Sequence, residues 1–247
     1  MRESNRLTGI ILNSKIFREN DRIISFYTKE LGKIEILVRS ARKIISKLAP
    51  LIAEPFVLVE LTVAPGKNFY HLIGGRIKKN FKHILSNYTK IIKTSFLLKK
   101  IDELVKLKKA EPRIFALINK WLEEVNRLPE DKIEIINSAF LIKLLSFLGY
   151  RPEIKKCLVC GKTIDNFLVQ RFAKPKSLYF NFQKGGAVCL EHGPDESQVK
   201  INFETLKLLQ NFLYRDFNFL EKQKFNPKSI LTAKILIKKF LSWHIDI

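Results

Sequence analysis

The sequence predicts an α+β protein in which an N-terminal OB-fold β-barrel precedes an all-helical domain that carries a small inserted finger. Three observations support this fold class. Short β-rich runs fill the first 80 residues, apolar residues then recur every three or four positions, and two matched Cys/His pairs interrupt the helical part. We therefore expect an OB-fold domain at residues 1–80 and a helical domain at 81–247, with the finger at about 153–195.

Five short runs rich in β-branched and aromatic residues predict five strands. Tight turns separate some of them, at Leu31-Gly32 and at Pro65-Gly66, and no long helix intervenes. Such a pattern is typical of a small barrel or sandwich, and the OB-type barrel is the leading choice because it needs five strands. Gly74-Gly75 inside the last run indicates a bulge or a barrel bend. The expected strands cover 7–15, 21–30, 33–40, 55–64 and 68–77.

After residue 80 the spacing of apolar residues becomes helical. Glu111-Pro112 predicts a helix start, because proline fits the first turn of a helix. Gly149 fits a helix end, since glycine readily adopts the left-handed conformation found there. The expected helices cover 91–105, 113–127, 133–148, 202–215 and 228–244.

Composition restricts the class of protein. The chain has 247 residues, of which 46% are hydrophobic and 28% charged, as in ordinary globular proteins. It contains no run of eighteen apolar residues, and the start "MRESNRLTGI" lacks the apolar core of a signal peptide. An odd number of cysteines, two of them two residues apart, does not resemble a secreted disulfide framework. We therefore expect a cytoplasmic protein.

The net charge of +21 and the pI near 9.9 indicate a polyanionic partner, because Lys and Arg release condensed counterions when they meet phosphates. A genome biased toward Lys is the alternative, although such a bias would not remove acidic residues. Residues 1–100 hold 20 Lys and Arg against 7 Asp and Glu, whereas residues 101–150 hold 8 of each. This contrast predicts two surfaces with different partners.

All three cysteines fall into two short motifs, Cys157-x2-Cys160 and Cys189-x2-His192. Two ligands at this spacing reach one ion from a single tight turn, and a second such turn completes a tetrahedron. Gly161 and Gly193 follow the two pairs, where a turn needs a permissive backbone. We expect one structural Zn²⁺ held by these four side chains in a zinc-ribbon-like finger. Three free cysteines beside an incidental histidine are the alternative.

No catalytic motif is present: the sequence lacks a Gly-rich phosphate loop, a G-x-S-x-G elbow and an H-E-x-x-H helix. We therefore expect no enzymatic activity. OB barrels bind single strands through a basic groove and stacked aromatic rings. The aromatic residues of the barrel, most of them expected in its core, are Phe17, Phe26, Tyr27, Phe69 and Tyr70. The basic residues expected to contact DNA are Arg18, Arg22, Arg39, Arg42, Lys43, Lys47, Lys78 and Lys79.

The order of these parts resembles the RecO family of recombination mediators. The resemblance covers nearly the whole chain and rests on "GIILNSKIFRENDRIISFYTKELGKIEILVRSARK", "LLSFLGYRPEIKKCLVCGK" and "GGAVCLEH". It implies binding of single- and double-stranded DNA and annealing of complementary strands. It also implies work with RecR and single-stranded-DNA-binding protein to load RecA. Family members usually end the zinc module in Cys-x2-Cys, whereas this chain has His192, which is also a competent zinc ligand.

The resemblance further implies that the helical region binds the acidic, aromatic C-terminal tail of single-stranded-DNA-binding protein. Such a tail needs an apolar pocket rimmed by cations. Two groups of lysines are candidates for that rim: Lys99, Lys100, Lys106, Lys108 and Lys109, or Lys234, Lys238 and Lys239. The alternative function is a zinc-stabilised RNA-binding factor or nucleic-acid enzyme. A deaminase is disfavoured because no H-x-E motif exists.

Overall fold

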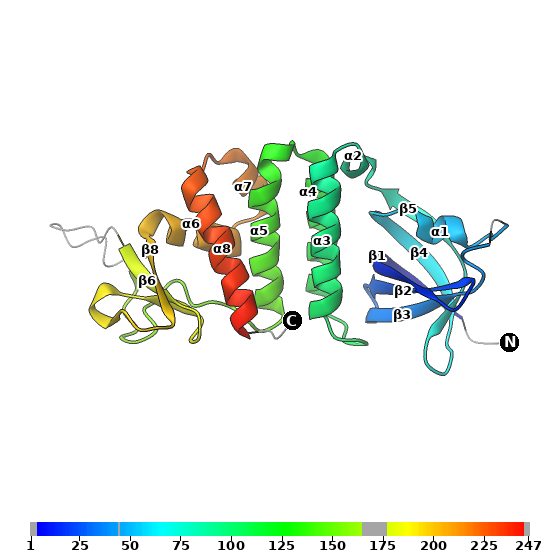
Figure 1. The fold of residues 1–247 in the computed structure, drawn as a ribbon, viewed down its shortest axis with the longest axis horizontal. Helices are drawn as coiled ribbons and strands as arrows, with labels where there is room; N and C mark the ends of the chain where they lie inside the picture. Colours follow the sequence, from blue (N-terminus) through cyan, green and yellow to red (C-terminus); the bar gives the residue numbers. More distant parts are fainter. Residues whose placement is uncertain (1–3, 44, 165–176, 245–247) are drawn as a thin grey trace. The chain divides into compact units, whose positions relative to one another are not determined.

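The computed structural model describes residues 4–43, 45–164 and 177–244. Residues 1–130 and 131–247 form two compact units, and each is described by itself. Figure 1 shows a closed β-barrel in the first unit and helices with a small sheet in the second. The predicted α+β fold class is confirmed, and the domain boundary expected at residue 80 stays a prediction. No helix in the described part of the chain is long and apolar enough to cross a membrane.

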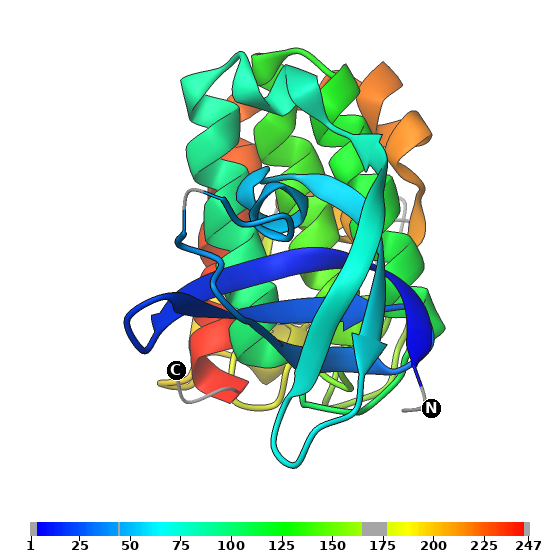
Figure 2. The ribbon, with the colours of Figure 1, turned by 90° about the vertical axis from the view of Figure 1, so that its right-hand side faces the viewer.

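Five strands close the barrel in the order β1-β2-β3-β5-β4, and β4 pairs back with β1 (Figure 2). All neighbours are antiparallel except β3 and β5, which pair in parallel at Ile36↔Tyr70 and Leu37↔His71. This is the arrangement expected of an OB-type barrel. The strands are β1 (Asn5–Phe17), β2 (Asp21–Thr28), β3 (Gly32–Val38), β4 (Val57–Ala64) and β5 (Tyr70–Asn80).

The inward-pointing side chains at alternate positions of the strands fill the barrel. In β4, every second residue from Val57 to Val63 is buried, and these side chains meet Ile24, Ile34 and Ile36 in one core. The predicted distortion near Gly74-Gly75 is present, because the register between β4 and β5 shifts there. Gly75 is required on steric grounds: a Cβ at this position would lie 2.5 Å from the carbonyl oxygen of Glu60.

Helices of the first unit pack beside the barrel. A short helix that the sequence did not predict, α1 (Ala49–Ala53), lies between β3 and β4, and another, α2 (Lys82–Leu85), follows β5. The long helices α3 (Tyr88–Leu104) and α4 (Pro112–Arg127) match the expected positions. Helix α4 begins as expected, with Pro112 in its first turn and the Glu111 side chain accepting a hydrogen bond from the backbone N–H of Arg113.

A polar cluster joins the barrel to α3. The carboxylate of Asp102 accepts hydrogen bonds from Asn13 Nδ2 at 3.2 Å and Ser25 Oγ at 2.5 Å, and it pairs with Lys33 Nζ at 3.2 Å. Lys33 also donates to the backbone carbonyl of Asp102. Three strands therefore meet one helical residue, which fixes α3 against the outer face of the barrel.

The second unit is built on α5 (Glu130–Phe147), whose side chains are buried around most of the helix. It ends near Gly149, which has the expected positive φ of +100°. Lys143 of α5 donates hydrogen bonds to the carbonyl oxygens of Leu213 at 3.0 Å and Arg215 at 2.8 Å. These bonds provide a donor for two carbonyl groups at the C-terminal end of α6. The remaining helices are α6 (Phe203–Tyr214), α7 (Phe217–Lys222), which was not predicted, and α8 (Pro227–His244).

The finger contains strands of a three-stranded antiparallel sheet, whose order is β7-β6-β8. Its strands are β6 (Ser177–Asn181), β7 (Gly186–Val188) and β8 (Gln198–Asn202). Residues 165–176 of the expected finger lie outside the described part. Asn202 is both the last residue of β8 and the N-cap of α6, where its side chain accepts from Thr205 N at 2.7 Å.

Candidate metal centre and nucleic-acid interface

The first ligand pair sits on a tight turn just after α5. Gly161 N donates to the carbonyl oxygen of Cys157 at 3.0 Å, and Cys157 N donates to the carbonyl of Lys162 at 2.9 Å. Gly161 adopts a φ of +71°, as the sequence predicted for a residue that must turn the chain sharply. This closed turn brings the side chains of Cys157 and Cys160 to the same side.

The second pair lies at the end of β7. Cys189 follows the strand, and Leu190–His192 form a 3-10 turn. In this turn, His192 N donates a hydrogen bond to the carbonyl oxygen of Cys189 at 3.1 Å. Gly193 differs from the expectation, because its φ of −136° is extended and needs no glycine. Glycine is needed there for space, since a Cβ would lie 2.5 Å from the ring of Tyr179.

The two turns bring the four predicted ligand side chains together. One ligand atom from each of Cys157, Cys160, Cys189 and His192 lies within 4.8 Å of the others. The Sγ atoms of Cys160 and Cys189 are 4.0 Å apart, and Cys189 Sγ lies 3.0 Å from His192 Nδ1. Two thiolates on one tetrahedral zinc ion are separated by roughly 3.8 Å, given Zn–S bonds of about 2.3 Å. The cluster is therefore compact enough for one metal ion.

The surroundings of the cluster favour the thiolate form of Cys157 and disfavour the thiolate form of Cys189. Burial alone would raise the pKa of Cys157, but hydrogen bonds from the backbone N–H groups of Cys160, Cys189 and Val159 to its sulfur lower that pKa to about 6. Burial and the adjacent Cys157 thiolate raise the pKa of Cys189 to about 11. A cation among these sulfurs would favour both thiolates. Three thiol ligands and one imidazole are the donors that Zn²⁺ prefers, so the residues fit that ion.

At one end of the barrel, a turn and a loop carry several of the predicted basic residues. Arg42 donates from its backbone to the carbonyl of Asn20 at 3.1 Å and from Nη1 to the carbonyl of Glu19 at 2.8 Å. Ser40 N donates to Asp21 Oδ1 at 2.8 Å. These bonds hold the loop after β3 against the β1–β2 turn, so exposed Arg18, Arg39 and Arg42 lie on neighbouring segments.

Four further predicted residues differ in their surroundings. Lys43 and Lys47 are exposed on the loop before α1. Lys78 and Lys79 lie near the far end of β5 and are ion-paired: Lys78 with Glu60 at 3.5 Å and Lys79 with Glu123 of α4 at 2.7 Å. The remaining one, Arg22, is half-buried and donates from Nε to Ser14 Oγ at 2.8 Å.

The aromatic residues of the barrel separate into two groups. Phe26 and Tyr27 are buried, and Tyr27 donates its hydroxyl to the carbonyl of Glu111 at 3.3 Å. Phe17 and Phe69 are half-buried at the rim, where their rings meet at 6.0 Å between centroids and bring the β4–β5 loop to the β1–β2 turn. Arg18 lies over the Phe17 ring at 5.2 Å. Tyr70 is also half-buried, but it packs against the barrel core. Among these five aromatic residues, we therefore take the rim pair as the candidates for contact with a ligand.

Sequence reasoning missed an exposed apolar stripe on α3, formed by Tyr88, Ile92 and Phe96. These side chains are 78%, 48% and 50% exposed. Their four-residue spacing places them on one helix face, away from the buried Leu97 and Ile101. That spacing was the available signal, but the buried face of the same helix has the same period.

The chain matches two family models, recombination protein O N terminal over residues 1–81 and recombination protein O C terminal over residues 85–247. It is 26% identical over 239 residues to the DNA repair protein RecO of Alkaliphilus metalliredigens (strain QYMF), covering 96% of this chain and 92% of that protein. It is also 26% identical over 240 residues to the DNA repair protein RecO of Thermoanaerobacter sp. (strain X514), covering 97% and 92% of the two chains.

Proposed function

Because the chain belongs to the RecO family, we propose that it is a non-catalytic DNA-binding protein of recombinational repair that anneals complementary strands. Membership of the RecO family supports a role of this protein in DNA repair and recombination. The annealing activity is our proposal. The observation that carries it is the assembly of Arg18, Arg39 and Arg42 on two hydrogen-bonded segments beside the Phe17–Phe69 pair.

This end of the barrel suits a single strand. Guanidinium groups neutralise phosphates, and aromatic rings stack on bases without regard to sequence. Lys43 and Lys47 continue the basic surface along the loop. The ion pairs of Lys78 and Lys79 weaken their claim to phosphate contacts, so we assign them a smaller share of the binding free energy than the loop residues.

The finger's role is structural in this proposal. Four protein side chains fill a tetrahedral shell and leave no position for water or substrate, so a bound Zn²⁺ would stabilise the finger. Cys157, Cys160, Cys189 and His192 would hold it, each through one atom. No step of annealing requires the ion.

We further propose that the protein works with RecR and single-stranded-DNA-binding protein in loading RecA. For the acidic tail of the latter, the α3 stripe of Tyr88, Ile92 and Phe96 offers an exposed apolar face, and Lys99 is exposed one turn beyond it. On α8, Lys234 is paired with Glu134 at 2.8 Å. Lys100 of α3 is likewise paired, with Glu103 at 2.6 Å, so we assign the tail to α3 for its exposed apolar stripe and not for a freer set of cations.

The DNA proposal is tested by reversing three charges, Arg39→Glu, Arg42→Glu and Lys43→Glu, in one variant. Binding of single-stranded DNA should weaken, and the slope of log affinity against log salt should become shallower by about 2, the effect of losing three phosphate contacts. Annealing of complementary oligonucleotides should slow in parallel. Fluorescence anisotropy at several salt concentrations measures the first effect, and strand-pairing kinetics measures the second.

A matched control reverses three exposed lysines of the second unit, Lys222, Lys224 and Lys228, which changes the net charge equally. That control should keep most of the affinity. Equal losses in both variants would mean that total charge, and not this end of the barrel, determines binding. An RNA competitor of the same sequence tests the alternative, because preference for RNA would point to an RNA-binding factor.

A further inference from the structure

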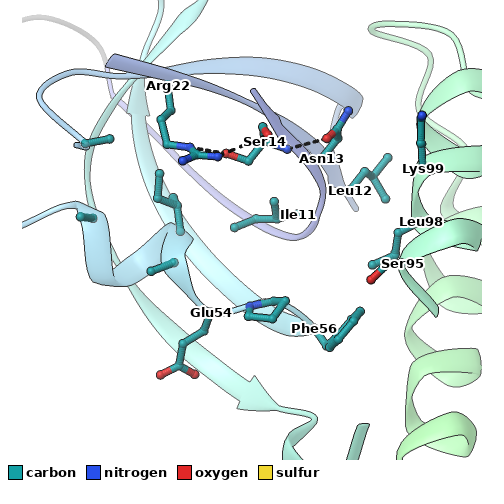
Figure 3. Close-up of a pocket in the computed structure, with 15 residues that line it drawn as sticks. Ile11, Leu12, Asn13, Ser14, Arg22, Glu54, Phe56, Ser95, Leu98 and Lys99 are labelled. Carbon is teal, nitrogen blue, oxygen red and sulfur yellow. Dashed lines mark hydrogen bonds between the residues drawn. The ribbon is translucent and has the colours of Figure 1, made fainter. Parts of the chain in front are cut away.

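A cavity of about 620 Å³ opens beside the barrel in the first unit, between β1, α1 and α3 (Figure 3). Two features of the sequence create it. The β1–β2 register skips Leu12, so β1 bulges there. The walls from α1 and the preceding loop are made by Ala41, Ala49 and Ala53, whose side chains are too small to fill the space.

The floor of the cavity is apolar and its rim is polar. Buried Leu12, Ile52, Phe56 and Leu98 form the floor. Asn13, Ser14 and Ser95 lie at the edge, with the cations of Arg22 and Lys99. Burial of apolar ligand surface on such a floor is favourable, and the polar rim can fix its orientation.

The charge of the rim is positive. Arg22 donates to Ser14 through Nε at 2.8 Å and Nη2 at 3.4 Å, which holds the guanidinium at the edge, and Lys99 is exposed on α3 (Figure 3). Glu54 is the single carboxylate among the described lining residues, and it accepts a hydrogen bond from Asn80. The cavity therefore fits a ligand with an apolar body and an anionic group.

A nucleotide of a single strand has this chemistry. The cavity falls in the range of roughly 300–1,000 Å³ typical of small-ligand sites, so one base with its sugar fits. Arg22 follows the same turn that carries Arg18 and receives Arg42, so neighbouring phosphates would meet those residues. A duplex keeps its bases paired and stacked and has no free base to offer.

We propose that this cavity receives one unstacked base of a single strand while the adjoining phosphate lies at Arg22 and Lys99. The inference rests on the proposed DNA-binding function and adds a reason for the protein to prefer single strands. It places a base-binding site between the barrel and α3, distinct from the Phe17–Phe69 rim pair.

Filling the cavity tests the proposal. Ala53 is exposed, so Ala53→Trp adds bulk without disturbing the core, and Ser95→Trp fills the cavity from the opposite wall on α3. Each variant should bind single-stranded DNA roughly tenfold more weakly, comparable to losing one stacked base, and keep its duplex affinity. Gly74→Leu is the control, because a Cβ there meets no atom within 4 Å.

A 2-aminopurine base within the oligonucleotide reports directly on the environment of the base. Its emission should rise when the wild-type protein binds, and both filled variants should abolish the rise while Gly74→Leu keeps it. Unchanged single-strand affinity and unchanged emission in both variants would overturn the cavity inference and leave the DNA proposal intact. A wild-type protein that binds no single-stranded DNA would overturn both.

The same variants distinguish a peptide ligand. An acidic peptide that ends in Phe is titrated into the wild-type protein and into the filled variants. If the peptide loses its binding to the filled variants while DNA affinity is unchanged, the cavity is a peptide site and the inference is wrong. Peptide affinity that is equal in all three proteins, together with the DNA loss, supports the base.

Discussion

Asp102→Ala should destabilise the first unit by about 3 kcal/mol, because it removes the partner of a nearly buried cation. The side chains of Asp102 and Lys33 are only 18% and 14% exposed, and their charged atoms lie 3.2 Å apart. The substitution also leaves Ser25 Oγ and Asn13 Nδ2 without the acceptor that they now share. Breaking a fully buried pair costs about 3–5 kcal/mol, and partial exposure places this pair at the low end.

Denaturant unfolding followed by Trp fluorescence measures the effect. Trp121 is fully buried in the first unit, so a Trp243→Phe background makes its emission report on that unit. Asp102→Asn should cost less than Asp102→Ala, about 1–2 kcal/mol, because the amide retains an acceptor but loses the charge.

A double-mutant cycle with Lys33→Met isolates the ion pair from the other contacts. Removing both partners should restore part of the stability, which gives a coupling free energy of about 1–3 kcal/mol. A coupling below about 0.5 kcal/mol would refute the reasoning, since the pair would then add nothing beyond its separate contacts. The result bears on how α3 is held against the barrel.

Three further predictions concern the metal, one lysine and one carboxylate. Cys157→Ser should lower the zinc content and the thermal stability of the second unit, whereas His192→Cys should keep about one zinc per chain; metal analysis and calorimetry decide both. Burial lowers the pKa of Lys143 to about 8 from its ordinary 10.5. The unfolded chain therefore binds more protons between those pH values, and the unfolding free energy should rise with pH across that window, relative to Lys143→Met. Glu124 is buried and pairs with two cations, so Glu124→Gln should lower the unfolding midpoint even in high salt, as urea titration would show.

The amino-acid sequence predicted those elements of the fold that are determined by residues close together in the chain. The strands followed from short runs of β-branched and aromatic residues, and the long helices followed from three- and four-residue spacing. The helix start at Glu111-Pro112 and the helix end at Gly149 are confirmed. The convergence of the ligand side chains followed from two x2 spacings, because each tight turn needs only neighbouring residues. Helix α1 escaped prediction because five residues are too few to show a helical period.

Contacts between distant segments could not be predicted. Asn13 and Asp102 are 89 positions apart, and the pairing of Lys79 with Glu123 spans 44. Nothing near Lys79 in the sequence indicates that its charge is already neutralised, so it was grouped with the loop residues. The cavity was equally hidden, since it depends on alanines from one segment facing a strand bulge and a helix from others.

The double position of Asn202 ties the metal centre to the helices. This residue ends β8, the strand beside β6, and its side chain also begins α6, so no linker separates the finger from the helical unit. Gln210 of α6 donates to the carbonyl of Ile154 at 2.8 Å, which adds a second bond between α6 and the segment that leads to Cys157. The finger and the helices should therefore unfold in a single cooperative transition. A bound metal ion would then raise the free energy of unfolding of the whole second unit, and not only of the finger.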